Sequence, residues 1–370
     1  MIPVNEPLLR GNELAYVREA VETGWVSSEG RFIREFEAVL AAYCGRRYGV
    51  AVCNGSAALE VATAAVNLQP GDEVILPTFT IIACAMAIVE RGAIPVLVDS
   101  EPDTWNMDVR QVADRITPRT RAIIAVHIYG HPTDMDPILQ LAKTHSLVVI
   151  EDAAEVHGAE YKGRLCGSLG DISTFSFYAN KIITTGEGGM LLTDDEGLAE
   201  RCRLHRNLCF QGKRRFVHEE LGRNFRMTNL QAAVGLAQME RIEQSLDKKR
   251  WIGRAYTERL RGTPGLLLPI ERPWARHVYW VYGIVLDEIV PFDATEFARR
   301  LVERGVQTRP FFWPMHEQPV FAQMGLFRGE RYPVAERIAR RGLYLPAGMA
   351  LTESQLDQVC VAVREVIGAA

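Results

Sequence analysis

The sequence predicts an α/β protein with a mostly parallel central sheet, followed by a smaller C-terminal α+β domain. Two patterns support this fold class: short apolar segments alternate with helical spacing over the first 150 residues, and the alternation ends after residue 170. The chain has 370 residues, of which 48% are hydrophobic and 24% charged. That size and composition are typical of a globular protein with two domains.

The first half of the chain alternates regularly. Apolar residues at helical spacing occupy residues 11–23 and 31–43, before the alternation starts. Buried strands are then predicted at 48–53, 73–76, 94–98, 122–126 and 147–150, and helices between them at 56–66, 80–90 and 135–145. Helical crossovers between short apolar strands produce a parallel sheet that is covered on both faces. Ligands bind at the carboxyl ends of the strands in such sheets.

The second half follows another pattern. Strands at 171–177 and 189–193 flank a glycine-rich turn, and two long helices are expected at 227–246 and 248–260. A strand at 277–286 and helices at 295–304, 333–341 and 352–367 complete the prediction. We therefore expect a large domain over residues 1–249 and a small one over residues 250–370.

Composition and charge exclude several classes of protein. The net charge is −4, so neither nucleic acid nor an anionic membrane is expected as a partner. The longest apolar run, residues 81–89, is shorter than the ~20 residues of a membrane span. The first residues do not resemble a signal peptide, so a cytoplasmic location is expected. The seven cysteines form no CxxC pair, which favours buried free thiols over disulfides or a metal site.

Lys181 is the lysine that best suits chemistry. It lies between the strand-like run at 174–178 and the glycine-rich segment at 182–189, whereas the other five lysines stand in polar surroundings. Partial burial lowers the pKa of an ammonium group and favours the nucleophilic amine that forms Schiff bases. The alternative is a lysine that extends from a strand end to water.

Other polar residues stand at predicted strand ends. Asp152 follows the strand at 147–150, where a carboxylate can hold a protonated ring nitrogen, although it could equally cap a helix. Ser56 and the Ala57 amide begin a predicted helix that can receive a phosphate, and Ser176 can supply a second hydroxyl. Each of these signals is also explained by ordinary capping or strand hydrogen bonds. Together with Lys181 they provide the anchors of pyridoxal 5′-phosphate.

The sequence resembles the DegT/DnrJ/EryC1/StrS sugar aminotransferases, which have the type I fold of pyridoxal phosphate-dependent transferases, as in aspartate aminotransferase. The resemblance covers nearly the whole chain, and residues 182–190 and 226–229 are most similar to the GDP-perosamine synthase branch. The stretches that carry it are 25–32 (WVSSEGRF), 54–59 (NGSAAL), 70–74 (PGDEV), 126–130 (VHIYG), 151–155 (EDAAE), 175–177 (FSF), Lys181, 186–189 (GEGG), 224–233 (NFRMTNLQAA) and 314–316 (PMH).

The resemblance implies roles for individual residues. Lys181 would be the catalytic residue that joins the cofactor and moves protons, and Asp152 would pair with the ring nitrogen. Glu155, where many relatives have Gln, would lie near the ring. Phosphate binding is implied for Ser56, Ala57 and Ser176, and Asn224 would reach the phosphate of the neighbouring subunit, so that a homodimer shares its active sites.

One position departs from the family pattern. Many relatives place a ring-stacking aromatic residue where this chain has Ile81, so either Ile81 packs on the cofactor ring or Phe79 shifts towards it. We expect weaker stacking but retained cofactor binding.

For the substrate side, His316, Arg309, His127 and Tyr129 are the expected contacts; His127 and Tyr129 could instead simply close the sheet. The basic stretch at 201–215 could receive a diphosphate or be a solvated surface.

The implied activity is transfer of an amino group from an amino acid, L-glutamate by family inference, to a nucleotide-linked 4-keto-6-deoxyhexose. Pyridoxal 5′-phosphate would cycle through pyridoxamine 5′-phosphate. In a dehydratase branch of the family histidine replaces the lysine, so Lys181 favours transamination. The alternatives are a UDP- or dTDP-linked sugar, amination at C3, and a non-catalytic regulator or structural homodimer. The sequence leaves Arg226 and Arg309 as candidates for binding the donor carboxylate.

Overall fold

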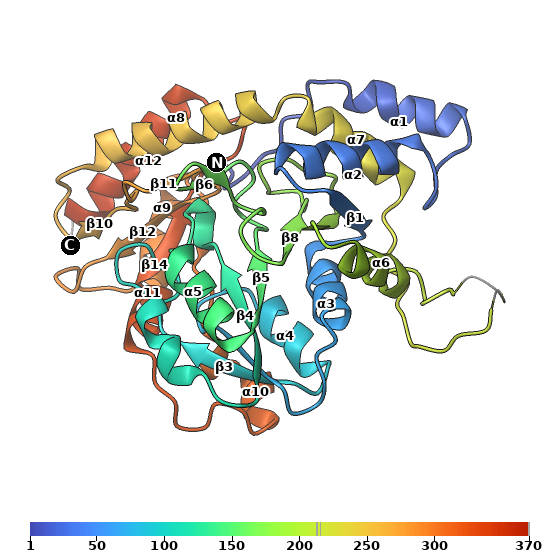
Figure 1. Cartoon of the computed structure of the whole chain (residues 1–370). Coiled ribbons are helices and arrows are strands. Elements are labelled where there is room, and N and C mark those ends of the chain that lie inside the picture. Colours follow the sequence, from blue (N-terminus) through green and yellow to red (C-terminus); the bar gives the residue numbers. More distant parts are fainter. Residues whose placement is uncertain (212–213, 215, 369–370) are drawn as a thin grey trace.

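The computed structural model describes residues 1–211, 214 and 216–368 (Figure 1). A seven-stranded sheet in the order β1-β9-β8-β5-β4-β2-β3 lies at its centre. β9 runs antiparallel to β1 and β8, and the other neighbouring strands are parallel. The mostly parallel sheet is therefore confirmed. Its strands are β1 (Tyr48–Val52), β2 (Glu73–Pro77), β3 (Ile94–Val98), β4 (Thr120–Val126), β5 (Val148–Asp152), β8 (Ile172–Ser176) and β9 (Gly189–Thr193).

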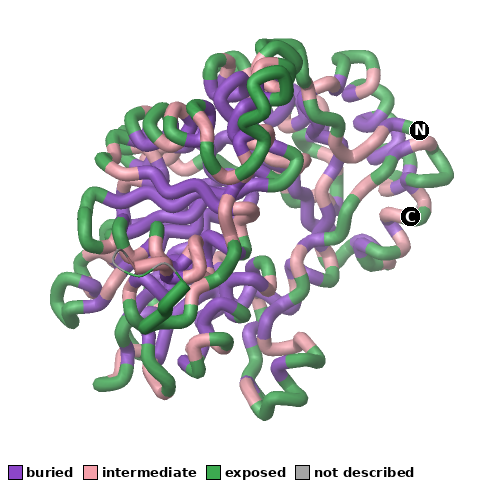
Figure 2. Tube along the Cα trace, turned by 90° about the vertical axis from the view of Figure 1, so that its right-hand side faces the viewer, coloured by how far each residue is buried: buried purple, intermediate pink, exposed green. Residues whose placement is uncertain are grey.

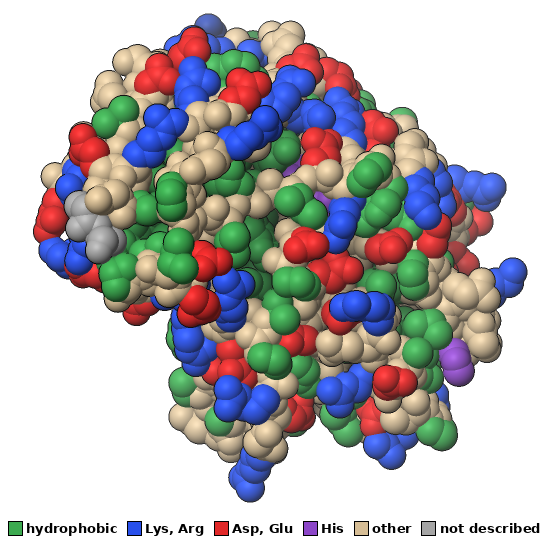
Figure 3. Space-filling view, turned by 90° about the vertical axis from the view of Figure 1, so that its left-hand side faces the viewer, with side chains coloured by type: hydrophobic (Ala, Val, Ile, Leu, Met, Phe, Trp, Pro, Cys, Tyr) green, Lys and Arg blue, Asp and Glu red, His purple; other side chains and the backbone are tan. Residues whose placement is uncertain are grey.

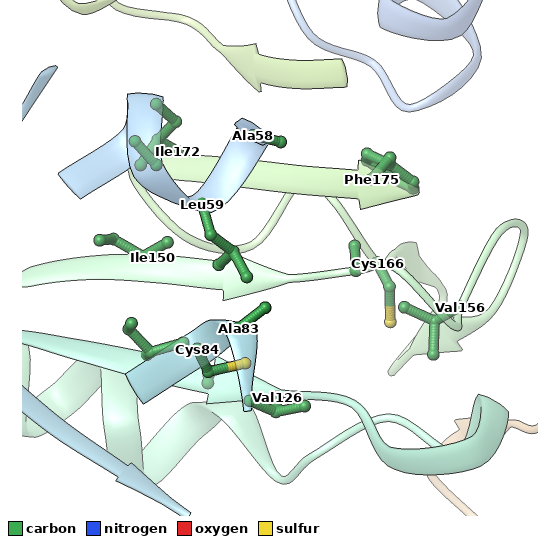
Figure 4. Packing of buried hydrophobic residues seen from close by; sticks show 14 of the residues in the cluster. Ala58, Leu59, Ala83, Cys84, Val126, Ile150, Val156, Cys166, Ile172 and Phe175 are labelled. Atoms are coloured by element: carbon green, nitrogen blue, oxygen red, sulfur yellow. The ribbon is translucent and has the colours of Figure 1, made fainter. Parts of the chain in front are cut away.

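Helices cover this sheet, as the apolar strands require. The strands form a continuous buried layer in Figure 2, and every residue of β2, β8 and β9 is buried. Figure 4 shows side chains of α3 and α4 packed over β4, β5 and β8. The helices of this part are α1 (Glu13–Glu22), α2 (Arg31–Tyr43), α3 (Gly55–Ala65), α4 (Ala83–Val89), α5 (Met135–His145), α6 (Glu196–His205) and α7 (Asn229–Met239).

A second apolar cluster forms around an antiparallel sheet of order β10-β12-β14-β13. The N-terminus joins it: Ile2 is buried in this cluster, and its amide donates to the Gly305 carbonyl (2.7 Å). The elements of this part are α8 (Ile242–Leu260), β10 (Leu266–Leu267), β12 (Tyr282–Leu286), α9 (Ala294–Glu303), β13 (Arg309–Pro310), α10 (Pro319–Gln323), α11 (Pro333–Arg341), β14 (Gly342–Leu345) and α12 (Glu353–Gly368).

Several short elements lie outside the predicted pattern. A small sheet in the order β11-β6-β7 links the two parts of the chain. Its strands are β6 (Glu160–Tyr161), β7 (Arg164–Leu165) and β11 (Ala275–Arg276), and short 3-10 helices lie at Val109–Gln111, Ala113–Arg115, Ile128–Gly130 and Met315–Glu317.

Two predicted elements have different bounds. The long helices break at residues 240–241 rather than at 247, so the expected domain boundary at 249/250 falls inside α8. The expected strand at 277–286 is reduced to β12, because Tyr279 adopts a left-handed conformation (φ 48°) that interrupts the extended chain. The division into domains 1–249 and 250–370 stays a prediction.

The surface agrees with the near-balanced charge of the chain. Acidic and basic side chains are interspersed over the face shown in Figure 3, without a broad field of one sign. None of the helices in the described residues is both long enough and apolar enough to cross a membrane.

Candidate active site

Polar residues gather at the carboxyl edge of the central sheet, where ligands bind in this class of fold. Asn54 follows β1, Thr78 follows β2 and His127 follows β4, while Asp152 ends β5 and Ser176 ends β8. Lys181 lies five residues beyond the end of β8. The parallel strands thus bring together residues that are far apart in the sequence.

Lys181 is buried at this edge. Its side chain is 9% exposed, and its Nζ lies 3.6 Å from Glu155 Oε1 and 3.6 Å from the centre of the Trp280 ring. Burial lowers the pKa of Lys181, and the negative charge of Glu155 partly opposes that shift. The alternative of a lysine that extends into water is therefore wrong, and the amine is suited to nucleophilic attack.

Glu155 forms the second half of a buried acid–base pair. Its Oε2 accepts a hydrogen bond from the Tyr129 amide (2.7 Å). Burial raises the pKa of Glu155 to about 7, with the charge of Lys181 acting in the opposite direction. The pKa values of the two partners therefore shift towards each other, which allows a proton to be shared near neutral pH.

Asp152 is a buried carboxylate held by neutral donors. Its Oδ1 accepts from the Ala154 amide (3.1 Å), and its Oδ2 accepts from the Cys84 thiol (3.1 Å). No ion pair within the described part of the chain includes Asp152. Since residues 153–195 contain no helix, the helix-cap alternative is wrong. A buried carboxylate in this state is suited to pair with a cationic ring nitrogen.

The turn before α3 packs tightly against the ends of β8 and β9. A Cβ on Gly55 would lie 2.8 Å from the Ser176 Cβ, and one on Gly189 would lie 2.3 Å from the Asn54 carbonyl oxygen. These glycines bring the start of α3 close to Ser176. The exposed Ser56 side chain and the first amides of α3, which have no acceptor inside the helix, then form a cradle for an anion.

The Ala57 amide, which was expected to bind phosphate, already donates its hydrogen bond within the chain. It donates to the Asn54 side chain (2.8 Å), which caps α3. The amides of Gly55 and Ser56 are better placed for this role, because they precede the capped position. The capping competition was not visible from residue types alone.

Ile81, which stands where many relatives have the ring-stacking aromatic residue, is accessible from solvent. Ile81 is 42% exposed, as expected for a side chain that faces a ligand. Phe79 is fully buried and packs against Tyr129, Phe311 and Phe312. A shift of Phe79 towards the cofactor would break this cluster, so the packing favours the alternative in which Ile81 covers the ring.

Two histidines expected to contact substrate are engaged within the chain. His127 is fully buried; its Nε2 pairs with Glu151 (3.0 Å), and its Nδ1 accepts from the Thr133 amide (2.9 Å). His316 bonds through Nδ1 to Thr78 (2.8 Å) and through Nε2 to Glu336 (3.2 Å). Substrate contact by these rings is therefore not supported, because every ring nitrogen already has a partner.

Tyr129 and Arg309 differ in accessibility. The Tyr129 ring is buried, and its hydroxyl accepts from the Phe312 amide (3.0 Å), so this residue closes the sheet and holds Glu155 through its own amide. Arg309 is exposed on β13 and acts electrostatically on Tyr344. Burial and the nearby Glu155 raise the pKa of Tyr344 to about 12, so both Glu155 and Arg309 lie near this hydroxyl.

The remaining expected contacts lie further along the chain. Asn224 is exposed and pairs with Asn207. In the basic stretch, Arg201 donates to the Ala65 carbonyl (2.8 Å) and Arg206 pairs with Glu37 (2.6 Å), so both hold neighbouring elements together. Lys213 and Arg215 of this stretch lie outside the described residues.

Sequence reasoning did not identify two close neighbours of the site. Trp280 lies against Lys181, and Cys84 lies against Asp152. Each contact joins residues about 70 to 100 positions apart, and only the three-dimensional fold shows them.

Comparison with known proteins identifies the family of the chain. The pattern of the DegT/DnrJ/EryC1/StrS aminotransferase family matches residues 7–364. The chain is 45% identical over 367 residues to a GDP-perosamine synthase of Caulobacter vibrioides, covering 99% of this chain and 98% of that protein. It is 38% identical to a pleiotropic regulatory protein of Geobacillus stearothermophilus, covering 91% and 89% of the two chains.

Solved structures show the same fold. The aminotransferase TlmJ from Streptoalloteichus hindustanus superposes with a TM-score of 0.93 at 33% identity, covering 100% of this chain and 99% of TlmJ. DesV of S. venezuelae gives a TM-score of 0.90 at 36% identity, covering 96% and 94% of the two chains.

The type I fold and the site define a pyridoxal phosphate-dependent aminotransferase. More closely, the chain belongs to the DegT/DnrJ/EryC1/StrS aminotransferase family. The residues fit the cofactor: Lys181 offers a buried amine, Asp152 a carboxylate that forms no ion pair within the described residues, and the glycine-lined start of α3 an anion cradle beside Ser176.

Proposed function

We propose that the protein transfers an amino group from L-glutamate to the keto group of a GDP-linked 4-keto-6-deoxyhexose, forming GDP-perosamine. The observation that carries this proposal is the buried Lys181 amine, flanked by Glu155 and close to Asp152. The GDP-perosamine synthases of Caulobacter vibrioides and of Escherichia coli O157:H7, the latter 40% identical over 98% of this chain, support the choice of sugar nucleotide.

Pyridoxal 5′-phosphate, when bound, supplies an aldehyde and an electron sink, and cycles through pyridoxamine 5′-phosphate. Lys181 binds it and then moves protons at the reacting carbon. Asp152 holds the ring nitrogen in its protonated form, since a carboxylate stabilises the cation beside it. Ser56 and Ser176 bind the phosphate with the first amides of α3, and Ile81 covers one face of the ring.

Glu155 adjusts the proton balance of the site. With a pKa raised to about 7, it takes up or releases a proton near neutrality while it stays fixed by the Tyr129 amide. Arg309 is the proposed contact for the carboxylate of the amino donor, because its guanidinium is exposed beside Tyr344. Arg226 is less suited, since it is already bonded to the Asn207 side chain.

We further propose that the enzyme acts in the cytoplasm as a homodimer with shared active sites. Asn224 is exposed on its own subunit, as a residue that reaches a neighbouring phosphate must be. A polysaccharide such as an O-antigen is the proposed destination of the amino sugar.

A panel of keto-sugar nucleotides tests the proposed activity. The protein, loaded with pyridoxal 5′-phosphate, is given glutamate and GDP-, dTDP- or UDP-linked 4-keto-6-deoxyhexoses, with Lys181→Ala as control. We expect the highest kcat/KM with the GDP-linked sugar and no turnover by the variant. Faster turnover of another nucleotide sugar would contradict the choice of nucleobase. No turnover and no spectral response to glutamate would instead favour the regulatory alternative.

A further inference from the structure

Cys84 lies in the second row of side chains behind the proposed cofactor site. It belongs to α4 and is fully buried; Figure 4 shows it between α4 and the end of β4, beside Val126. Its thiol donates to Asp152 Oδ2 over 3.1 Å, and Thr80 Oγ1 lies 3.5 Å from the same sulfur. The thiol therefore joins the segment after β2 to the end of β5.

The thiol stays protonated, so it acts as a donor. Burial and the negative charge of Asp152 raise the pKa of Cys84 well above its ordinary value. Asp152 has a second donor, the Ala154 amide on Oδ1, which belongs to its own turn. Cys84 is consequently the side chain that fixes the rotation of the carboxylate from another part of the fold.

The orientation of this carboxylate matters for the ring nitrogen. A hydrogen bond between Asp152 and a protonated ring nitrogen requires an oxygen lone pair to point at it, and rotation of the carboxylate would remove that alignment. An S–H group is a weak donor, so it orients Asp152 while leaving most of the negative charge available to the ring.

From this geometry we infer that Cys84 is a positioning residue, whose hydrogen bond keeps the Asp152 carboxylate oriented towards the ring nitrogen of pyridoxal 5′-phosphate. The inference rests on the proposed function, since it needs the cofactor to bind with its ring nitrogen at Asp152. It predicts a role for the donated hydrogen bond itself, apart from the volume of the side chain.

Three substitutions separate the hydrogen bond from packing. Cys84→Val fills the same space without a donor, Cys84→Ala removes both, and Cys84→Ser keeps a donor. Cys202→Val, at a fully buried thiol on α6, is the matched control. The dissociation constant of pyridoxal 5′-phosphate and the pH dependence of its bound absorption spectrum are measured for each protein, and urea unfolding of the cofactor-free forms reports folding.

We expect the dissociation constant to rise about 3- to 12-fold in Cys84→Val and Cys84→Ala, the upper part of the range for loss of an ordinary hydrogen bond, because the S–H group is a weak donor. The pH midpoint of the change in the absorption spectrum should move in both variants. The dissociation constants of Cys84→Ser and Cys202→Val should stay within about twofold of the native value. With 1-deazapyridoxal 5′-phosphate, which has no ring nitrogen, Cys84→Val and the native protein should bind equally.

Native affinity and an unchanged spectrum in Cys84→Val would overturn the inference, as would an equal loss in all three Cys84 variants. A Cys84→Val penalty of the same size with the deaza analogue would also overturn it, since the effect would then not pass through the ring nitrogen. If the native protein bound no pyridoxal 5′-phosphate at all, the proposed function would fail together with the inference.

Discussion

Burial sets the chemistry of single residues at the carboxyl edge of the sheet. Lys181 and Glu155 are ordinary surface residue types, yet removal from water shifts their pKa values in opposite directions, down for the amine and up for the carboxyl group. Lys181 Nζ lies 3.6 Å from Glu155 Oε1, close enough for the charge of each group to act on the pKa of the other. This pair gives the site a reactive amine beside a carboxyl group that can take up or release a proton.

Substitution of Glu155 by Gln tests the coupling. The negative charge of Glu155 raises the pKa of Lys181, so its removal should lower that pKa further. The amine would then be deprotonated at lower pH, and the acid limb of the rate of pyridoxal 5′-phosphate uptake should move in the acid direction. Absorbance stopped-flow between pH 5.5 and 9 measures this rate.

The exposed Glu200→Gln on α6 serves as the control for that experiment. It should leave the acid limb in place because its carboxyl group is solvated. An unmoved limb in Glu155→Gln would show that the two groups titrate independently.

Sequence patterns predicted the residues that stand at strand ends but not their partners. Lys181, Asp152 and Ser176 were identified because each follows or ends an apolar strand. Trp280 and Cys84 could not be identified, since no local pattern reports a contact between distant segments. His127 and His316 were expected to contact substrate. Their contacts with Glu151 and Glu336, which occupy the rings, are visible only in the folded chain.

At the scale of elements, α8 is fixed to the C-terminal sheet by a buried cation. The Nζ of Lys249 donates to the carbonyls of Trp280 (2.9 Å) and Ala347, and no carboxylate forms an ion pair with it among the described residues. Desolvation lowers the pKa of Lys249 to about 7. The polar residues around Lys249 in the sequence predict a solvated side chain, and this prediction is wrong because Lys249 is buried in the folded chain.

Stability should therefore depend on pH through Lys249. Its folded pKa of about 7 lies below the unfolded value of 10.5, so the unfolded chain binds more protons between these values, and this group's contribution to stability rises with pH. Between pH 7.0 and 8.5 the contribution should grow by about 1.5 kcal/mol. Urea unfolding of the native protein and of Lys249→Met, at both values, measures it as the change in their difference.

The exposed Lys143→Met on α5 is the matched control and should show no such change. A constant difference between the native protein and Lys249→Met across this pH range would contradict the assigned pKa. Buried thiols such as Cys202 have raised pKa values and lower the stability above pH 8.5. Their effect cancels in the difference between the two proteins' free energies of unfolding, because both contain these thiols.

Elements with strong periodicity were predicted with correct ends. This holds for α2, β3, α5 and β9, whose bounds match the expected residues. The break between α7 and α8 was missed because residues 240–241 contain neither Gly nor Pro, the residues that mark helix breaks in a sequence. The two-residue strands β6, β7 and β11 carry too little pattern to be recognised.

At the scale of the whole molecule, alternation along the sequence was enough to predict the fold class, whereas the order of strands was not. β9 lies between β1 and β8 and runs antiparallel to both, and the side-chain types of a single strand do not indicate its neighbours. The N-terminus also crosses to the second cluster through Ile2, which no local signal indicates.

Subunit complementation tests the proposed shared active site. Lys181→Ala removes the amine, and Asn224→Ala removes the proposed contact to the neighbouring phosphate. In a mixed dimer one site carries both defects and the other is intact, so an equal mixture should recover about a quarter of native activity. Activity of the mixture is compared with the mean of the two parent variants after unfolding and refolding together.

Activity no greater than that mean would contradict sharing of Asn224 between subunits. In the control, Asn67→Ala replaces Asn224→Ala, because Asn67 is exposed and is not one of the proposed site residues. In that mixture each site depends only on whether its own subunit carries Lys181. The activity should therefore equal the mean of the two parent variants.

The most direct measurement is chemical trapping of the amine. The protein is incubated with pyridoxal 5′-phosphate, reduced with sodium borohydride, digested and analysed by mass spectrometry. The account predicts a phosphopyridoxyl group on the peptide that contains Lys181, in stoichiometric amount and lost in Lys181→Ala. Stoichiometric label on any of the other five lysines, with the Lys181 peptide unmodified, would contradict it.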